Sequence, residues 1–141
     1  MSSNSRILFS LLLAVLAFSI WPASTAAQQM EVIAGGELEY QTSCAVCHGV
    51  DGRGQGIMSR HLTMQPSNLR HLAQRHGGKF PFWEVYRVVE GRGVVPGHGS
   101  REMPIWGDRF RADAGANGKS AQTQSAGRIL SLVFYLDHIQ E

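Results

Sequence analysis

Hydrophobic and polar positions divide the chain into one long apolar run near its start and a series of shorter amphipathic segments. The run covers residues 7–21, follows Arg6, and is succeeded by small residues. This order of charge, apolar run and small residues predicts a cleavable signal peptide over residues 1–27, cut after Ala26 or Ala27. A retained membrane anchor is the alternative, but the run is shorter than the roughly 20 residues that span a bilayer.

The first amphipathic segment predicts a helix over residues 32–44. Gly36, Tyr40 and Cys44 are spaced four residues apart, so they share one helix face. Each glycine in a helix costs about 1 kcal/mol relative to alanine. We therefore expect Gly35 and Gly36 to allow a close crossing by another helix, with fraying of the helix start as the alternative.

Two further helices are predicted in the second half of the chain. One covers residues 80–90, with a proline suited to its first turn and Gly91 suited to its exit, and the other covers residues 125–138. Each carries an apolar stripe at helical spacing, formed by Phe82, Val85, Tyr86 and Val89 in the earlier helix and by Ile129, Leu132, Val133 and Leu136 in the later one.

The segments between these helices are predicted to be mainly loops. Glycines punctuate residues 49–66, where we expect a loop with a short helical turn near residues 57–62. Residues 68–76 predict a short capped helix, and residues 91–107 predict another loop. Residues 108–125 are polar and small, which predicts a surface connection without core positions.

Length and charge limit the number of domains and the kinds of partner. Residues 28–141 suffice for one small domain, and their helical periodicities predict an all-α fold. Without Arg6, the basic residues outnumber the 11 acidic residues by a single residue. This near-balance does not indicate nucleic acid or an anionic membrane as a partner.

The most informative chemistry lies in the pentapeptide Cys44-Ala45-Val46-Cys47-His48. Cys-x-x-Cys-His is typical of covalent haem attachment, in which each thiol adds to one haem vinyl group and the imidazole binds the iron. We therefore expect one haem c attached through Cys44 and Cys47, with His48 as an iron ligand. A thioredoxin-like dithiol would need a βαβ context, and a structural zinc site would need a second pair of ligands.

A sixth iron ligand has to come from elsewhere in the chain. Met103 is the strongest candidate, because it lies in a glycine- and proline-rich loop 55 residues after His48. Pro104 also restricts the Met103 backbone to extended conformations. His98 and an open sixth position are the alternatives. The weaker candidates are Met30, Met58, Met64, His61, His71, His76 and His138.

Together these segments resemble a small single-haem cytochrome c of class I. The resemblance rests on the helix before the haem motif, the glycine-rich stretch after it, the apolar final helix, the Pro66-x-Asn68-Leu69 segment, and the segment from His98-Gly99 to Met103-Pro104-x-Trp106-Gly107. It implies a mostly helical fold wrapped around one haem c, with His48 and Met103 as axial ligands.

The resemblance also implies several supporting roles. The first and last helices are expected to cross at Gly36, against Phe134 or Tyr135. The Pro66 carbonyl is expected to accept the imidazole N–H of the haem motif. Candidates for contact with the haem ring or its propionates, with core packing or a solvated position as the alternative, are Trp83, Trp106, Arg92 and Arg101.

The predicted function is the transfer of single electrons between redox protein partners in the periplasm. Two strong axial ligands keep iron six-coordinate in both oxidation states, and a thioether favours the reduced iron. We expect either a free carrier or the haem subunit of an oxidoreductase complex, with no membrane span once residues 1–27 are removed. The alternatives are a haem enzyme or gas sensor with an open sixth site, and a thiol oxidoreductase without haem.

Overall fold

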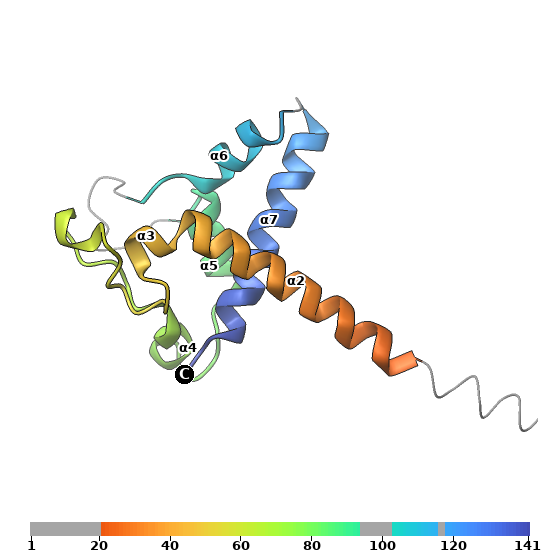
Figure 1. Cartoon of the computed structure of the whole chain (residues 1–141), viewed down its shortest axis with the longest axis horizontal. Coiled ribbons are helices and arrows are strands. Elements are labelled where there is room, and N and C mark those ends of the chain that lie inside the picture. The colour runs from red at the N-terminus through yellow and green to blue at the C-terminus, as the bar shows by residue number, and fades with distance from the viewer. Residues whose placement is uncertain (1–20, 94–102, 116–117) are drawn as a thin grey trace, which may run out of the picture. The chain divides into compact units, whose positions relative to one another are not determined.

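A computed structural model of the chain describes residues 21–93, 103–115 and 118–141. Within these ranges every regular element is helical, which confirms the predicted all-α fold (Figure 1). The elements, with η marking 3₁₀ helices, are α2 (Trp21–Ser43), α3 (Ala45–His48), η1 (Ser59–His61), η2 (Leu69–His71), α4 (Leu72–Arg75), α5 (Phe82–Glu90), α6 (Trp106–Asp113) and α7 (Lys119–His138).

The chain separates into two compact units, residues 1–31 and residues 32–141. The first unit is described from Trp21 and is helical to its last residue, with exposed side chains from Thr25 onward. The predicted signal peptide, residues 1–27, lies largely outside the described ranges and stays a prediction, as does the domain boundary that it sets. In the described part of the chain, no helix has both the length and the apolar character needed to cross a bilayer.

In the second unit, α2 crosses α7 at Gly36. The position that a Cβ atom of Gly36 would occupy lies against the backbone carbonyl of Ser131 and 2.8 Å from the Cβ of Tyr135. One turn further along α2, the ring of Tyr40 packs on that of Tyr135, with centroids 5.4 Å apart. The predicted helix crossing is confirmed, with Tyr135 rather than Phe134 at the contact.

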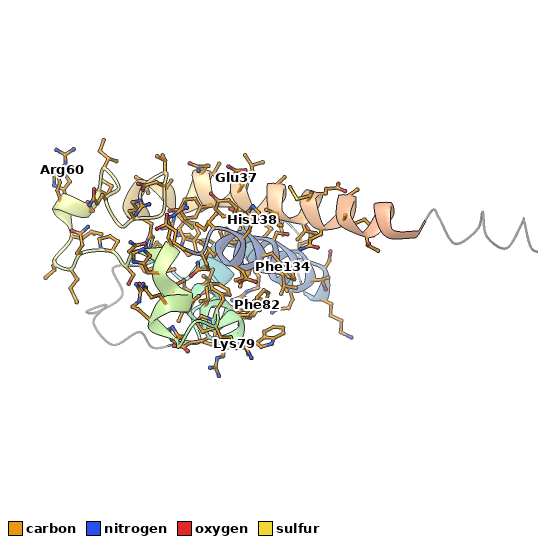
Figure 2. The ribbon with its side chains drawn as sticks, turned by 90° about the horizontal axis from the view of Figure 1, so that it is seen from below. Glu37, Arg60, Lys79, Phe82, Phe134 and His138 are labelled. Carbon is orange, nitrogen blue, oxygen red and sulfur yellow. The ribbon has the colours of Figure 1, made fainter. Side chains whose placement is uncertain are left out.

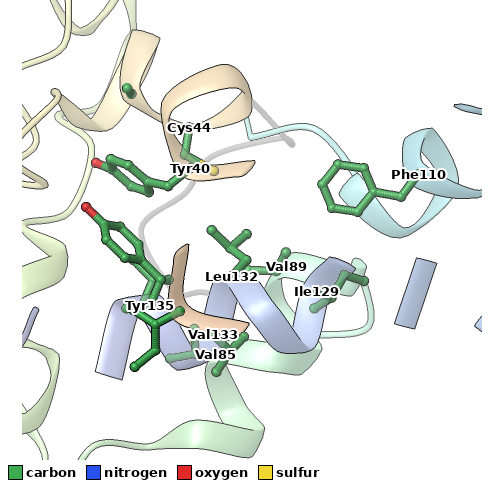
Figure 3. Close-up of a cluster of buried hydrophobic side chains, with 12 residues drawn as sticks. Tyr40, Cys44, Val85, Val89, Phe110, Ile129, Leu132, Val133 and Tyr135 are labelled. Atoms are coloured by element: carbon green, nitrogen blue, oxygen red, sulfur yellow. The ribbon is translucent and has the colours of Figure 1, made fainter. Parts of the chain in front are cut away.

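Buried side chains from α2, α3, α5, α6 and α7, together with Cys44, form a hydrophobic core around this crossing (Figure 3). Burying an aliphatic side chain contributes about 1.5–3 kcal/mol, so packing rather than intrinsic propensity stabilises these helices. All four predicted stripe positions of α7 are buried, whereas Phe82 and Tyr86 of α5 are only half-buried. The core members are Ile33, Tyr40, Cys44, Ala45, Val85, Val89, Phe110, Ile129, Leu132, Val133, Tyr135 and Leu136.

The polar stretch at 108–125 is not the surface connection that its composition predicts. α6 occupies its first part and buries Phe110, of which 1% is exposed, and α7 begins at Lys119 rather than at residue 125. Ser125 is buried, and its hydroxyl donates to the Gly107 carbonyl at 3.1 Å. Because a hydrogen-bonded hydroxyl takes a buried position, this part of α7 lacks the large apolar stripe that marks a core helix.

Arg128 joins α2, α6 and α7 in the same region. Its guanidinium carbon lies 3.9 Å from the ring centroid of Phe110, within the range of a cation–π contact. The guanidinium donates to both carboxylate oxygens of Glu39, at 2.8 and 3.0 Å, and pairs with Asp113 at 3.2 Å. The hydrogen bond to Glu39 raises the pKa of Arg128, so the guanidinium stays charged, and its two bonds to the carboxylate fix one geometry.

The shorter predicted elements are confirmed with changed boundaries. The helix predicted over 80–90 is α5, and Gly91 follows it in the left-handed conformation, with φ 96°. The short helix predicted over 68–76 is divided into η2 and α4, and the Asn68 side chain caps it by accepting a backbone N–H at 3.0 Å. The turn predicted near residues 57–62 is η1.

The two glycines of α2 form a matched pair of test positions. Replacing Gly36 with alanine puts a methyl group into the Ser131 carbonyl, so we expect a loss of about 1–3 kcal/mol of unfolding free energy. Nothing lies within 4 Å of the corresponding position at Gly35, so Gly35→Ala is expected to stabilise the protein by about 0.5–1 kcal/mol. Urea unfolding followed by circular dichroism measures both, and equal effects would contradict the close crossing.

Candidate functional site

One helical turn brings the three residues of the haem motif together. α3 contains this turn, and the N–H groups of Cys47 and His48 donate to the Cys44 carbonyl at 3.1 and 2.9 Å. Positions i, i+3 and i+4 lie on one helix face, so both thiols and the imidazole project to the same side. Cys44 and His48 are buried, and Cys47 is half-buried.

Glycines after the motif let the following loop turn back onto it. The N–H of Gly54 donates to the His48 carbonyl at 2.7 Å, and the N–H of Gly56 donates to the carbonyl of the preceding cysteine at 3.0 Å. The Tyr40 hydroxyl donates to the Gly49 carbonyl at 2.5 Å. Burial raises the pKa of Tyr40, so the hydroxyl keeps the proton that this bond requires. The loop is therefore held against the motif by backbone and side-chain bonds.

The imidazole is oriented by the carbonyl of Ser67, whose oxygen lies 3.1 Å from Nδ1 of His48. The prediction that the Pro66 carbonyl accepts this hydrogen bond is wrong, because the acceptor is the carbonyl of the next residue. The Pro66 carbonyl points at Gly54 instead, where the missing Cβ leaves room for it. A carbonyl only accepts, so Nδ1 carries the proton and Nε2 carries the lone pair. This tautomer presents Nε2 as a metal ligand.

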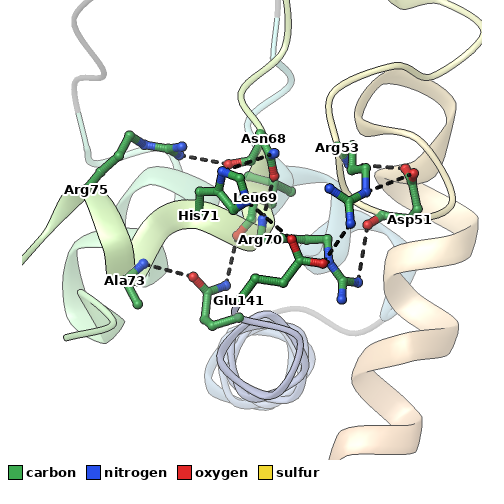
Figure 4. A network of polar contacts seen from close by, with 10 residues as sticks. Asp51, Arg53, Asn68, Leu69, Arg70, His71, Ala73, Arg75 and Glu141 are labelled. Atoms are coloured by element: carbon green, nitrogen blue, oxygen red, sulfur yellow. Dashed lines mark hydrogen bonds and ion pairs between the residues drawn. The ribbon is translucent and has the colours of Figure 1, made fainter. Parts of the chain in front are cut away.

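The segment that contains Ser67 is held from two sides (Figure 4). The N–H of Leu69 donates to the Gly52 carbonyl at 2.7 Å, which ties the segment to the loop after the motif. From the other side, the Gln140 side chain accepts the Ala73 N–H and donates to the Leu69 carbonyl, each at 2.8 Å. The acceptor of the imidazole proton thus belongs to a well-bonded backbone.

The carboxylate of Glu141 links the same two segments. One oxygen accepts from Arg53 and from Arg70 at 2.7 Å each, and the other lies 3.2 Å from Nε2 of His71. Arg53 lies in the loop after the motif, whereas Arg70 and His71 follow Ser67. The hydrogen bond from Arg70 lowers the pKa of Glu141, so its charge persists into mildly acidic solution.

Two hollows beside the motif share three lining residues, Cys44, His48 and Met103. Their volumes are about 170 and 300 Å³, which together fall within the range of cofactor sites, about 300–1,000 Å³. Most of the further lining is apolar. It includes Cys47, Leu62, Met64, Pro66, Pro104 and Trp106 in the smaller hollow, and Leu69, Leu72, Val85, Val88, Val89, Leu132 and Leu136 in the larger one.

Comparison with known families decides the class of this site. The family model described as Cytochrome c matches residues 33–108, which is more than half of the chain. The chain belongs to the cytochrome c family. Comparison with curated proteins and with solved structures gives no significant match. Family membership and the Cys-x-x-Cys-His spacing identify the protein as a haem c electron-transfer protein with one covalently bound haem.

The surroundings of the motif fit such a group. The cytochrome presents two thiols and an imidazole on one side of largely apolar hollows, as haem attachment requires. Burial, with a smaller contribution from Glu39, raises the pKa of the Cys44 thiol to about 12. A site that disfavours a charged thiolate is suited to the uncharged sulfur of a thioether.

Met103 is the sixth-ligand candidate that the structure brings to both hollows of the cytochrome. Met64 lines the smaller hollow only, and His76 lines the larger one only. The alternative ligand His98 lies outside the described residues. The remaining candidates line neither hollow: Met30, Met58, His61, His71 and His138.

The predicted ring and propionate partners have different outcomes. Trp106 lines the smaller hollow and packs on Phe110, with ring centroids 5.6 Å apart. Trp83 lines neither hollow and is largely exposed. Arg92 is exposed and pairs with a buried carboxylate two residues before it, which fits the solvated alternative. Arg101 lies outside the described residues.

Sequence reasoning missed two cations at the cytochrome's hollows. Arg75 lines the larger hollow and Arg109 lines the smaller one. Guanidinium groups at these positions are suited to pair with carboxylates such as haem propionates. The only sequence signal for Arg109 is its helical spacing from Trp106, and its guanidinium lies 5.3 Å from that ring centroid.

The Glu141 carboxylate gives a pH-dependent test of the network that holds the Ser67 segment. Because its folded pKa is lowered, its contribution to stability is complete above the unfolded pKa, about 4.3, and is lost as pH falls through the folded value. At neutral pH we expect Glu141→Gln to have a lower urea midpoint than the unaltered protein. At a pH below the folded pKa of Glu141, the two proteins are expected to have the same midpoint. A difference that stays constant with pH would contradict the ionic role.

Proposed function

We propose that this cytochrome carries single electrons between redox proteins in the periplasm, with His48 and Met103 as the axial iron ligands. The placement of Met103 carries the proposal, because Met103 lines both hollows together with Cys44 and His48. Haem c supplies an iron centre that takes up and releases one electron. The chain's own residues have to hold that centre, exclude water and admit partners.

The two proposed ligands are held in different ways. Ser67 accepts the Nδ1 proton of His48, which fixes the ring orientation and makes Nε2 a stronger donor. Pro104 keeps the Met103 backbone extended, so an otherwise flexible thioether is aimed in one direction. A methionine opposite a histidine raises the reduction potential relative to two histidines.

The apolar walls support the same role. Val85, Val89 and Leu132 are buried and line the larger hollow, where they displace water. Ferric haem carries one more positive charge than ferrous haem, and an apolar environment disfavours that charge. The walls therefore favour the reduced form, as the thioether does, so both raise the potential at which the cytochrome accepts an electron.

A carrier fits this arrangement better than the alternatives. A haem enzyme or gas sensor needs a sixth iron position that an external molecule can occupy. In our proposal, the side chain of Met103 occupies the sixth position, so no external molecule binds there. Membership of the cytochrome c family argues against the other alternative, a thiol oxidoreductase without haem.

The proposed partners are redox proteins that meet the cytochrome briefly. Val46, Ile57, Met58 and Met64 are exposed on and after the haem motif, and two of them, Val46 and Met64, line the smaller hollow. A small apolar surface next to the cofactor suits the weak, short-lived interfaces of electron transfer. The apolar run and small residues within 1–27 support export to the periplasm.

Met103 and Met64 form a matched pair for testing the ligand assignment. We expect Met103→Ala to lose the weak near-infrared band of methionine-ligated ferric haem and to bind carbon monoxide rapidly in the ferrous state, because the sixth position opens. Met64→Ala is expected to keep the band and to bind carbon monoxide slowly, like the unaltered protein. Retention of the band in Met103→Ala, or rapid carbon monoxide binding by the unaltered protein, would contradict the assignment.

A second pair, Gly54 and Gly78, tests how His48 is held. Both glycines have positive φ, 82° and 86°, so alanine costs about 1–2 kcal/mol of backbone strain at either position. Only at Gly54 does the added methyl group meet the Pro66 carbonyl and displace the neighbouring Ser67. We expect Gly54→Ala to raise the reduction potential, because a looser Nδ1 hydrogen bond makes the imidazole a weaker donor to ferric iron.

Gly78→Ala is the control, since nothing lies within 4 Å of its added methyl group. It is expected to lower the unfolding free energy and to leave the potential unchanged. Voltammetry of the two holoproteins measures the difference. Equal shifts in the two variants would show that backbone strain, and not the Ser67 hydrogen bond, controls the potential.

A further inference from the structure

The segment that carries Met103 runs directly into α6, and the start of α6 is held by two other helices. Only three residues separate Met103 from Gly107. One of them is Pro104, whose φ is fixed by its ring, and consecutive Cα atoms are about 3.8 Å apart. A displacement of Ile105 or Gly107 is therefore transmitted to Met103 with little slack.

The first of the two helices is α5, which is fixed at both of its ends. At its start, the ring of Phe82 packs on that of Phe134 of α7, with centroids 4.9 Å apart, and Figure 2 shows the two rings side by side. At its end, the Arg87 carbonyl accepts the N–H groups of residues 91–93 at 3.1, 2.9 and 2.8 Å. Three bonds to one carbonyl fix the exit of α5, so its last residues are a firm support for a neighbouring segment.

Two glycines let the end of α5 and the start of α6 meet without side chains between them. A Cβ atom at Gly107 would lie 2.6 Å from the carbonyl oxygen of Glu90 and 3.1 Å from its Cγ. A Cβ atom at Gly91 would overlap a methyl group of Ile105. Carbon atoms in ordinary contact are about 3.5–4.0 Å apart, so neither position has room for a side chain. We define the glycine corner by Glu90, Gly91, Ile105 and Gly107.

Polar contacts also hold the glycine corner. Glu90 is 7% exposed, and its carboxylate pairs with Arg92. A buried carboxylate needs such a partner, so the Glu90 side chain keeps its place beside Gly107. From α7, the Ser125 hydroxyl donates to the Gly107 carbonyl at 3.1 Å. Gly107 therefore has fixed contacts with both α5 and α7.

The segment held in this way is a wall of the haem site. Met103, Pro104, Trp106 and Arg109 line the smaller hollow, and Met103 lines the larger one as well. No residue of the glycine corner lines either hollow, and Ser125 lines neither. An effect of the corner on the iron therefore has to pass through the segment that begins at Met103.

We propose that the glycine corner and Ser125 position the Met103 thioether for the iron and keep the sixth position closed when the haem is oxidised. Gly107 and Ser125 are positioning residues, since they act through Met103. A thioether favours ferrous iron, so its bond to ferric iron is the weaker one and depends more on how the methionine is held. The proposal rests on the proposed axial ligation.

Imidazole binding to the ferric holoprotein tests the proposal, because imidazole competes with the thioether for the sixth position. In Gly107→Ala, the added methyl group meets the Glu90 carbonyl and strains the segment while Met103 is bound. Release of this strain is expected to make imidazole bind about tenfold more tightly. Gly127→Ala, in α7, is the matched control, because nothing lies within 4 Å of its added methyl group. Equal affinities of Gly107→Ala and the unaltered protein would overturn the proposal.

Gly78→Ala separates positioning from stability. Its positive φ makes this variant less stable through backbone strain. The methionine-bound and imidazole-bound states are both folded, so a general loss of stability leaves the imidazole affinity unchanged. Tightening of the same size in Gly78→Ala and Gly107→Ala, measured by optical titration, would show a merely structural role and overturn the proposal.

Ser125→Ala keeps the test valid if Gly107→Ala takes up haem poorly. It removes the hydroxyl that bonds the Gly107 carbonyl, and we expect imidazole to bind about threefold more tightly. Thr123→Ala is its control, because the Thr123 hydroxyl donates to the Lys119 carbonyl within α7. Equal affinities in Ser125→Ala and Thr123→Ala would count against the proposal and overturn it.

Met103→Ala distinguishes a failure of the glycine corner from a failure of the ligand assignment. Loss of the thioether is expected to tighten imidazole binding. An unchanged affinity would contradict the axial assignment, and this proposal with it. In the Met103→Ala background, Gly107→Ala is expected to have no further effect, because the corner acts through Met103. An equal effect of Gly107→Ala in both backgrounds would overturn the positioning role and leave the ligand assignment in place.

Discussion

The close approach of α2 to α7 at Gly36 is the contact on which the rest of the site depends. A side chain at this position would meet the Ser131 carbonyl and hold the two helices apart. Tyr40 and Cys44 follow Gly36 at intervals of four residues, so the crossing also decides what they face. Tyr40 packs on Tyr135 of α7, and Cys44 lines both hollows. The next helical turn then carries His48, whose place in the fold is therefore set by a contact three turns earlier.

Orientation of the imidazole depends on a second, longer-range arrangement. The Ser67 carbonyl that accepts the His48 proton belongs to a segment bonded to residues far away in the sequence. Glu141 is 88 residues from Arg53 and 71 residues from Arg70, yet one of its oxygens accepts from both. Single exposed ion pairs contribute little to stability, but this carboxylate joins three side chains on two segments. The direction of the imidazole is thus a property of the tertiary structure, although its position is set by one local turn.

These two scales explain what could be predicted from the sequence. The spacing of Cys44, Cys47 and His48 is local, so the haem motif and the helix that ends in it were open to prediction, as was a methionine before a proline. The prediction of the acceptor of the imidazole proton was wrong by one residue. The contact of the Pro66 carbonyl with Gly54 decides which carbonyl turns toward the imidazole. The helices within 108–125 were missed for a related reason. Their burial depends on partners in distant helices and on one buried aromatic side chain. The sequence of this stretch has no apolar stripe from which that burial could be predicted.

In the proposed ligation, the reduction potential results from opposing effects that come from different parts of the chain. The thioether of Met103 and the apolar walls from α5 and α7 favour ferrous iron. The Ser67 carbonyl acts in the opposite direction, because a proton drawn from Nδ1 of His48 makes the imidazole a better donor to ferric iron. The carbonyl is positioned by a polar surface network, whereas the walls are positioned by the core. Changes in surface charge and changes in core packing therefore reach the iron by separate routes, so the potential is adjustable without any change of ligand.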